Sequence, residues 1–181
     1  MAFYISECIL YAVLAVCAVT DIRHHQIPNR VTAAGAAAGL LCAFGAGAVS
    51  GASVPDLRAG LGYLGRMALV AAAGFPFFVF RMIGAGDIKL MAVMAAYLGM
   101  DRGLKSIGVG LCLGAVLALG RLLREGSGCQ RFSYLTAYIR RFIHSREIEA
   151  YYCPERDGYR CVIPLGACFL AGTLVTSLWK A

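Results

Sequence analysis

Two aspartates lie where the neighbouring sequence makes an acidic side chain costly. Asp21 closes the first apolar stretch, in the segment TDIR, and Asp87 opens a later one, in the segment GAGDIK. Ionisable groups at membrane depth are functional candidates by default. Two carboxylates that lie close together cannot both ionise cheaply, so they share a proton. If these two meet, we expect them to activate a water for hydrolysis of a peptide bond, without a metal or a nucleophilic serine or cysteine.

The elements that position the two acids are predicted to be membrane helices. Of the 181 residues, 60% are hydrophobic, and apolar runs recur with polar gaps between them. This pattern is typical of a polytopic all-α membrane protein, and the chain has room for one domain, residues 1–181. We predict about six transmembrane helices: Phe3–Thr20, Val31–Val49, Leu61–Phe80, Ile88–Met100, Leu104–Leu119 and Val162–Leu178. The first is expected to be a retained helix and not a signal peptide, because no basic region precedes it and no cleavage site follows it.

The basic residues predict the orientation of these spans. With the N-terminus outside, the inner loops hold twelve of the seventeen Lys and Arg residues: Arg23, Arg30, Arg81, Lys89 and eight arginines between Arg121 and Arg160. The outer side keeps Arg58, Arg66, Arg102, Lys105 and Lys180. Because positive charge near span ends is retained in the cytoplasm, Asp21 and Asp87 are both expected at the cytoplasmic face.

The other eight acidic residues are expected to have ordinary roles. Glu7, Asp56 and Asp101 fall at the outer side, and the remaining five lie in the long inner loop: Glu125, Glu147, Glu149, Glu155 and Asp157. The arginines of that loop offer them solvated partners of little energetic consequence.

The segment before Asp87 suggests a special environment. A span that begins at Ile88 has thirteen residues and covers roughly 20 Å, against a hydrocarbon core of about 30 Å. Either the bilayer thins there or Asp87 is drawn below the headgroups. Gly84 and Gly86 would let the backbone turn tightly and let another segment approach closely. The alternative is that Asp87 only caps the helix after a glycine turn.

The segment after Asp21 also has two interpretations. Asp21 could cap a loop or pair with Arg23, and the adjacent His24 and His25 are expected to be solvated. Pro28 ends the first helix and Asn29 can cap the next, so residues 21–30 are predicted to form a compact turn. Sixty-six residues separate Asp21 from Asp87, and small-xxx-small seams at 35–39 and 110–114 would let the helices pack closely.

These segments resemble a known family. GAGDIK looks like the GxGD motif of membrane aspartic proteases, and Asp21 with IPN after it resembles the other aspartate region of type IV prepilin peptidases. The resemblance implies that Asp21 and Asp87 are the catalytic pair, with Gly84, Gly86, Lys89, Pro28 and Asn29 as supporting motif residues. It implies cleavage of prepilin-like leader peptides at the cytoplasmic face of a prokaryotic inner membrane, commonly after a glycine. No cofactor is expected.

The chain departs from longer family members. Those have an N-terminal cytoplasmic region with paired CxxC motifs and can also methylate the new terminus, whereas this chain begins with its first span and has no CxxC. We therefore expect peptidase activity without methyltransferase activity. The chain resembles the short prepilin peptidases more than presenilin-like proteases, whose first aspartate follows a tyrosine, because Thr20 precedes Asp21 here.

Other sequence features are expected to be structural. Five of the eight cysteines lie in predicted spans, and Cys129, Cys153 and Cys161 lack further ligands at a recognisable spacing, so no metal is predicted. The inner loop, residues 121–161, contains an amphipathic stretch over 132–143 that is predicted to lie along anionic lipid headgroups. Topology and lipid account for the net charge of +7, and nucleic-acid binding has no separate support.

Two alternatives from other functional classes remain open at this stage. A small transporter could use Asp21 and Asp87 as a proton or cation site, although such sites usually lie near the bilayer midplane. A noncatalytic pilus-assembly subunit could use them in salt bridges with a partner.

Overall fold

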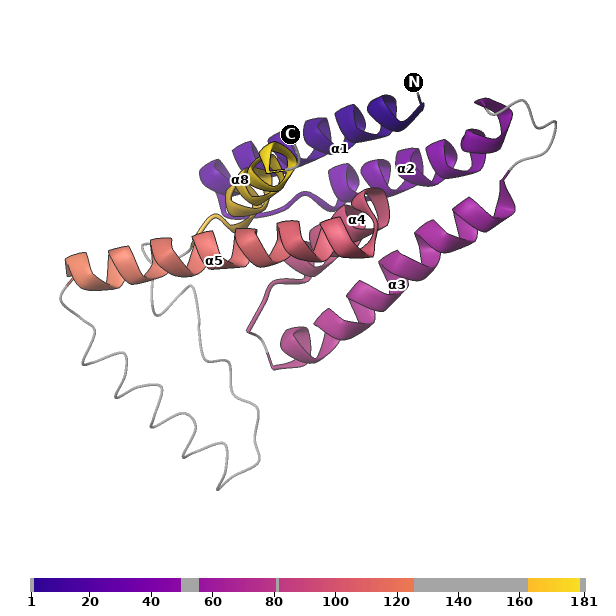
Figure 1. The fold of residues 1–181 in the computed structure, drawn as a ribbon. Helices are drawn as coiled ribbons and strands as arrows, with labels where there is room; N and C mark the ends of the chain where they lie inside the picture. The colour runs from indigo at the N-terminus through magenta and orange to yellow at the C-terminus, as the bar shows by residue number, and fades with distance from the viewer. Residues whose placement is uncertain (1, 50–55, 81, 126–162, 180–181) are drawn as a thin grey trace.

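The chain folds into a bundle of helices (Figure 1). The computed structural model describes residues 2–49, 56–80, 82–125 and 163–179. They form α1 (Ala2–His24), α2 (Asn29–Val49), α3 (Leu57–Val79), α4 (Ala85–Leu98), α5 (Met100–Glu125) and α8 (Leu165–Leu178). Within these residues there is no β-strand, so the all-α prediction is confirmed. The amphipathic stretch 132–143 and Cys129, Cys153 and Cys161 lie outside the described residues.

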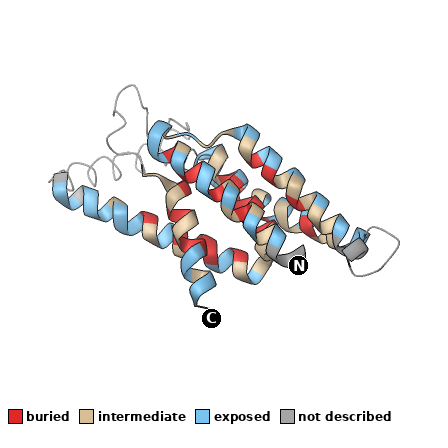
Figure 2. Ribbon diagram, turned by 90° about the horizontal axis from the view of Figure 1, so that it is seen from above, coloured by how far each residue is buried: buried red, intermediate tan, exposed pale blue. Residues whose placement is uncertain are grey.

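Length and composition make this a membrane protein. Three helical segments are long and apolar enough to cross a bilayer, namely Ile5–His24, Leu57–Val79 and Met100–Arg121. Large apolar side chains such as Leu41, Phe75 and Val116 are exposed on the outside of the bundle. Figure 2 shows buried residues concentrated on the faces that the helices turn toward one another. Lipid is the solvent that suits such an outer surface.

The central helix is α4. It contacts α1, α2, α3, α5 and α8, and most of its residues are buried. With 14 residues it covers about 21 Å, which is shorter than the hydrocarbon core of about 30 Å. Because other helices surround it, α4 does not have to match the bilayer thickness by itself.

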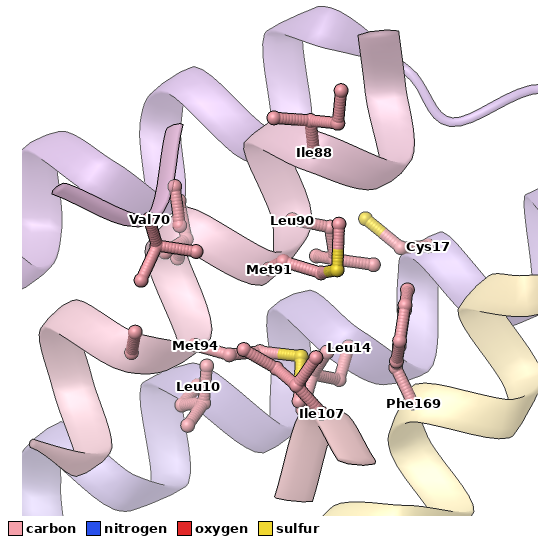
Figure 3. Close-up of a cluster of buried hydrophobic side chains, with 13 residues drawn as sticks. Leu10, Leu14, Cys17, Val70, Ile88, Leu90, Met91, Met94, Ile107 and Phe169 are labelled. Atoms are coloured by element: carbon pink, nitrogen blue, oxygen red, sulfur yellow. The ribbon is translucent and has the colours of Figure 1, made fainter. Parts of the chain in front are cut away.

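The hydrophobic core is built around α4. Leu90 and Met94 of this helix are fully buried among Leu10 and Leu14 of α1 and Phe169 of α8 (Figure 3). A helix that is apolar around its whole circumference is expected at such a buried position. The core therefore ties the first, fourth and last described helices into one unit.

Two glycine seams let these helices approach closely, as the small-xxx-small pattern predicts. A Cβ on Gly39 of α2 would lie 2.5 Å from the hydroxyl of Tyr63 and from the ring of Tyr97. A Cβ on Gly110 of α5 would lie 2.7 Å from the ring of Phe169 in α8. At both positions only glycine leaves room for the neighbouring helix.

The first connection is shorter than the sequence predicts. We expected a turn over residues 21–30, but α1 continues through Asp21 to His24, and only residues 25–28 separate it from α2. His25 has a left-handed backbone, with φ of 51°, and its N–H donates to the Asp21 carbonyl at 2.9 Å. This bond is the αL type of helix C-cap, which ends α1 one turn after Asp21.

Consecutive helices from α1 to α5 run in opposite directions (Figure 1). The end of α1 and the start of α4 therefore lie at the same end of the bundle. Asp21 and Asp87 are at this end, while Glu7, Asp56 and Asp101 are at the other.

The far end of α4 is held by a partly buried cation. Arg66, counted above among the outer charges, lies near the middle of α3 within a candidate span, and its Nη2 donates to the Ala96 carbonyl at 3.0 Å. Ala96 is among the last four residues of α4, whose carbonyls lack partners within the helix. Nearby, the hydroxyls of Tyr63 and Tyr97 donate to the carbonyls of Ala36 and Gly35. This polar cluster fixes α4 against α2 and α3.

We predict that Arg66→Leu destabilises the protein by about 1–3 kcal/mol, because a carbonyl at the end of α4 loses its charged donor away from water. Thermal unfolding in detergent or lipid checks this, and Arg58→Leu, at an exposed position in the first turn of α3, is the matched control. Equal melting temperatures for the two variants would contradict the capping role of Arg66.

Candidate active site

Asp21, in α1, is buried where this helix packs against the start of α8. Its side chain is in the last turns of α1, and the residue is 6% exposed. Its Oδ2 accepts a hydrogen bond from the backbone N–H of Gly166, in the first turn of α8, at 2.7 Å. That amide is one of the N–H groups that a helix start leaves without an internal partner. Asp21 therefore caps α8 from a different helix.

Asp87 is half-buried in the first turn of α4. The N-cap residue is Gly84, so the interpretation of Asp87 as the N-cap itself is wrong. Three residues further on, the Asp87 carboxylate accepts a backbone hydrogen bond from Gly84. This is the reciprocal half of a capping box, formed here by an aspartate.

The two carboxylates are close enough to interact electrostatically. Both sit at helix starts, Asp87 on its own helix and Asp21 on α8, at the same end of the bundle. Like charges in such a place share a proton more readily than they both ionise. The chemistry that this pair could perform is activation of a water, and the catalytic roles of Asp21 and Asp87 stay a prediction.

The two glycines before Asp87 provide space. Gly84 has an ordinary extended backbone, with φ of −67° and ψ of 146°, so the tight turn we expected there does not require glycine. A Cβ on Gly84 would instead lie 3.0 Å from Oδ2 of Asp87. A Cβ on Gly86 would lie 3.0 Å from Cβ of Ile27, so Gly86 provides the close approach of another segment that its small size suggested.

The α1–α2 connection is fastened to the start of α4. Besides the contact of Ile27 with Gly86, Nζ of Lys89 donates to Oδ1 of Asn29 at 2.9 Å. Asn29 is the first residue of α2, and the carbonyl of Pro28 accepts N–H bonds from the residues that follow. The motif residues Pro28, Asn29, Gly86 and Lys89 thus meet in one place, next to the two acids in the chain.

His25 also belongs to this site. His24 is exposed, as expected, but His25 is half-buried and interacts electrostatically with Asp21. We expected both histidines to be solvated, and the left-handed turn at the end of α1 explains the difference for His25. A histidine tolerates this backbone conformation better than most residues.

The other described acids whose side chains are placed have ordinary partners. Glu7 pairs with Arg102 at 3.1 Å, and Asp101 pairs with Lys105 at 3.0 Å. Asp56 caps α3 by accepting the N–H of Ala59 at 3.0 Å. Among the described residues there is no cluster of three or more His, Cys, Asp and Glu side chains that could hold a metal ion.

Sequence reasoning missed Gly166. The only local signal is the segment PLG at 164–166, a proline and a glycine before an apolar run, which is a common way to start a helix. That segment does not reveal that the amide of Gly166 reaches an acid 145 positions earlier in the chain.

Comparison with known proteins gives one match. The model of the type IV leader peptidase family matches residues 8–119, more than half of the chain. The matched region includes Asp21, Asp87 and the residues that fasten the α1–α2 connection to α4, and it ends before α8. No curated protein and no solved structure matches the chain.

We predict that Lys89 and Asn29 are energetically coupled. In a double-mutant cycle of Lys89→Met and Asn29→Ala, monitored by unfolding, the coupling should be about 1 kcal/mol, because the charged donor links two helix starts. The control is the pair Lys105 and Asp101, which is exposed like Lys89 and Asn29 but lies within one helix, and for which about 0.3 kcal/mol is expected. Additive effects of the Lys89 and Asn29 variants would show that the bond does not hold the two segments together.

Proposed function

Because this chain belongs to the type IV leader peptidase family, we propose that it is an aspartic endopeptidase that removes the leader peptide of prepilin-like proteins. The observation that carries the proposal is that Asp21 and Asp87, two acids from helices far apart in the sequence, lie at the same end of the bundle and within electrostatic reach of each other. Each acid is held by a backbone amide at a helix start, so both side chains have defined positions. Such a pre-oriented pair suits catalysis of hydrolysis.

The proposed reaction needs only the two carboxylates and a water. One carboxylate is ionised and takes a proton from the water, whose oxygen forms a bond to the scissile carbonyl carbon. The other carboxyl group is protonated and donates a hydrogen bond to the carbonyl oxygen. When the tetrahedral intermediate collapses, the C–N bond breaks and the leaving amine takes up a proton from the pair. The carboxylates then share one proton again, ready for the next cycle.

The proposed place of cleavage is the cytoplasmic face of a prokaryotic inner membrane. The bias of Lys and Arg toward the inner loops supports this orientation. A substrate whose hydrophobic segment stays in the bilayer would present the bond before that segment at the membrane edge. Asp21 and Asp87, at the end of one helix and the start of another, are suitably placed to meet it.

The position of the two acids near helix ends weighs against a transporter. Coupling sites of transporters usually lie near the bilayer midplane, between interrupted helices. Here the two acids are within one turn of helix ends at one end of the bundle. A subunit that used the acids only to bind a partner would not need to hold them at one end of the bundle within electrostatic reach of each other.

We predict that Asp21→Asn and Asp87→Asn each lower prepilin cleavage at least about a thousandfold, because either amide breaks the proton-sharing pair. An asparagine keeps an oxygen that can accept the capping N–H bond, so the fold should be retained. The measurement is the rate of leader removal from a prepilin reconstituted in membranes, with thermal unfolding of each variant.

The control for this experiment is Asp101→Asn, at an exposed position far from the site. A folded Asp21 or Asp87 variant that processes prepilin at the normal rate would refute the dyad mechanism. Loss of ion flux with intact processing would point to a transporter instead.

We also predict that Gly84→Ala lowers kcat about tenfold, because the added methyl displaces the Asp87 carboxylate by a few tenths of an ångström. The backbone at Gly84 suits alanine, so the melting temperature should change little. Gly65→Ala, whose methyl would meet nothing within 4 Å, is the control. Equal kcat for the two variants would mean that the Asp87 side chain is not confined by Gly84.

A further inference from the structure

The last described helix completes the site from outside the matched region. The family match ends at residue 119, whereas α8 begins at Leu165. We propose that Gly166 is a positioning residue: its backbone N–H holds Oδ2 of Asp21 and thereby orients the carboxylate for the reaction. The catalytic part of this inference rests on the proposed function, and the structural part does not.

The contact itself is short and enclosed. The N–H of Gly166 lies 2.7 Å from Oδ2 of Asp21, and both residues are buried. The amide is at the second position of α8, after the N-cap Pro164 and Leu165. Unpaired amides and the helix dipole make a helix start a favourable place for a carboxylate. In this setting Asp21 has a fixed donor that keeps one of its oxygens in place.

A side chain at position 166 would crowd Asp21. A Cβ at position 166 would lie 3.1 Å from Oδ2 of Asp21, 3.3 Å from its Cβ and 3.3 Å from the backbone carbonyl oxygen of Cys17. Two of these three atoms cannot move away by a simple side-chain rotation. The backbones of α1 and α8 therefore approach so closely that a methyl group at position 166 requires its neighbours to shift by a few tenths of an ångström.

A second contact holds α8 independently of Asp21. Further along α8, a Cβ on Gly172 would lie 2.6 Å from the backbone nitrogen of Gly110 in α5. The hydroxyls of Ser106 and Thr176 also hydrogen-bond across this seam, at 2.6 Å. Because α5 fixes α8 along its length, the amide of Gly166 is a rigid donor and does not depend on Asp21 for its position.

In this arrangement the two carboxylate oxygens of Asp21 have different roles. Oδ2 is bonded to an amide that does not change during the reaction, which limits rotation of the carboxylate. Oδ1 is then the oxygen that is left for proton transfer, whichever of the two acids takes the proton of the attacking water. Holding a reacting group in one orientation is a large part of what an active site contributes to rate.

The test compares two glycines of the same helix. Gly166→Ala should lower kcat for prepilin cleavage ten- to a hundredfold with KM within about twofold, because the methyl displaces the Asp21 carboxylate and not the substrate. Gly172→Ala should lower the melting temperature at least as much, because it opens the α5–α8 seam, but reduce kcat less. Gly120→Ala, whose methyl would meet nothing within 4 Å, is the neutral control. Losses of kcat that follow the losses of stability in both variants would overturn the positioning role.

A second measurement does not depend on activity. In the Asp21→Ala background the carboxylate is gone, so Gly166→Ala should lower the melting temperature less than it does in the wild-type chain. Equal shifts in the two backgrounds would show that Gly166 and Asp21 are not coupled. If the wild-type chain fails to cleave prepilin while this coupling is found, the proposed function is wrong and the contact of Gly166 with Asp21 still stands.

Discussion

The structure depends on the need of helix ends for hydrogen-bond partners where water is scarce. In a bilayer, backbone amides and carbonyls that lack partners are costly, and the two 14-residue helices, α4 and α8, have ends that must find partners within the protein. The start of α4 receives the carboxylate of Asp87, and the start of α8 receives that of Asp21. The end of α4 receives the guanidinium of Arg66. These bonds bring the charged groups of the bundle to defined positions.

The two acids therefore combine a structural and a proposed chemical role. An aspartate that caps a helix is an ordinary feature, and by itself it would argue against catalysis. Here both caps are at one end of the bundle, and their charges interact. The bonds that satisfy the helix starts are also the bonds that orient the carboxylates. The same amides can thus stabilise the fold and prepare the site, which makes the capping and catalytic interpretations compatible.

Close packing makes this arrangement possible. Glycines at 84, 86 and 166 leave space for a carboxylate, for the α1–α2 connection and for the backbone of α1. The central position of α4 lets a helix that is too short for the bilayer carry Asp87 at its start. In a core of this density, an added methyl group at any of these glycines has a neighbour to displace.

The sequence by itself predicted the six described helices to within about six residues at each end, although only three helical segments are long and apolar enough to cross a bilayer. It also indicated the membrane environment and the two acids. Apolar runs and the segments GAGDIK and IPN are local features, and local features suffice to predict a span or a motif. Sequence also predicted small residues at helix contacts, but it did not identify all the partners. Only the tertiary structure placed Gly166 against Asp21, Arg66 against Ala96 and His25 beside Asp21. It also decided that α1 continues past Asp21, because the cap that ends the helix is the backbone conformation of His25. The partners of Gly166 and Arg66 are set by how the helices pack, which depends on residues far apart in the chain and leaves no periodic signal in the sequence. His25 is close to Asp21 in the chain, and its placement follows from the left-handed backbone that ends α1.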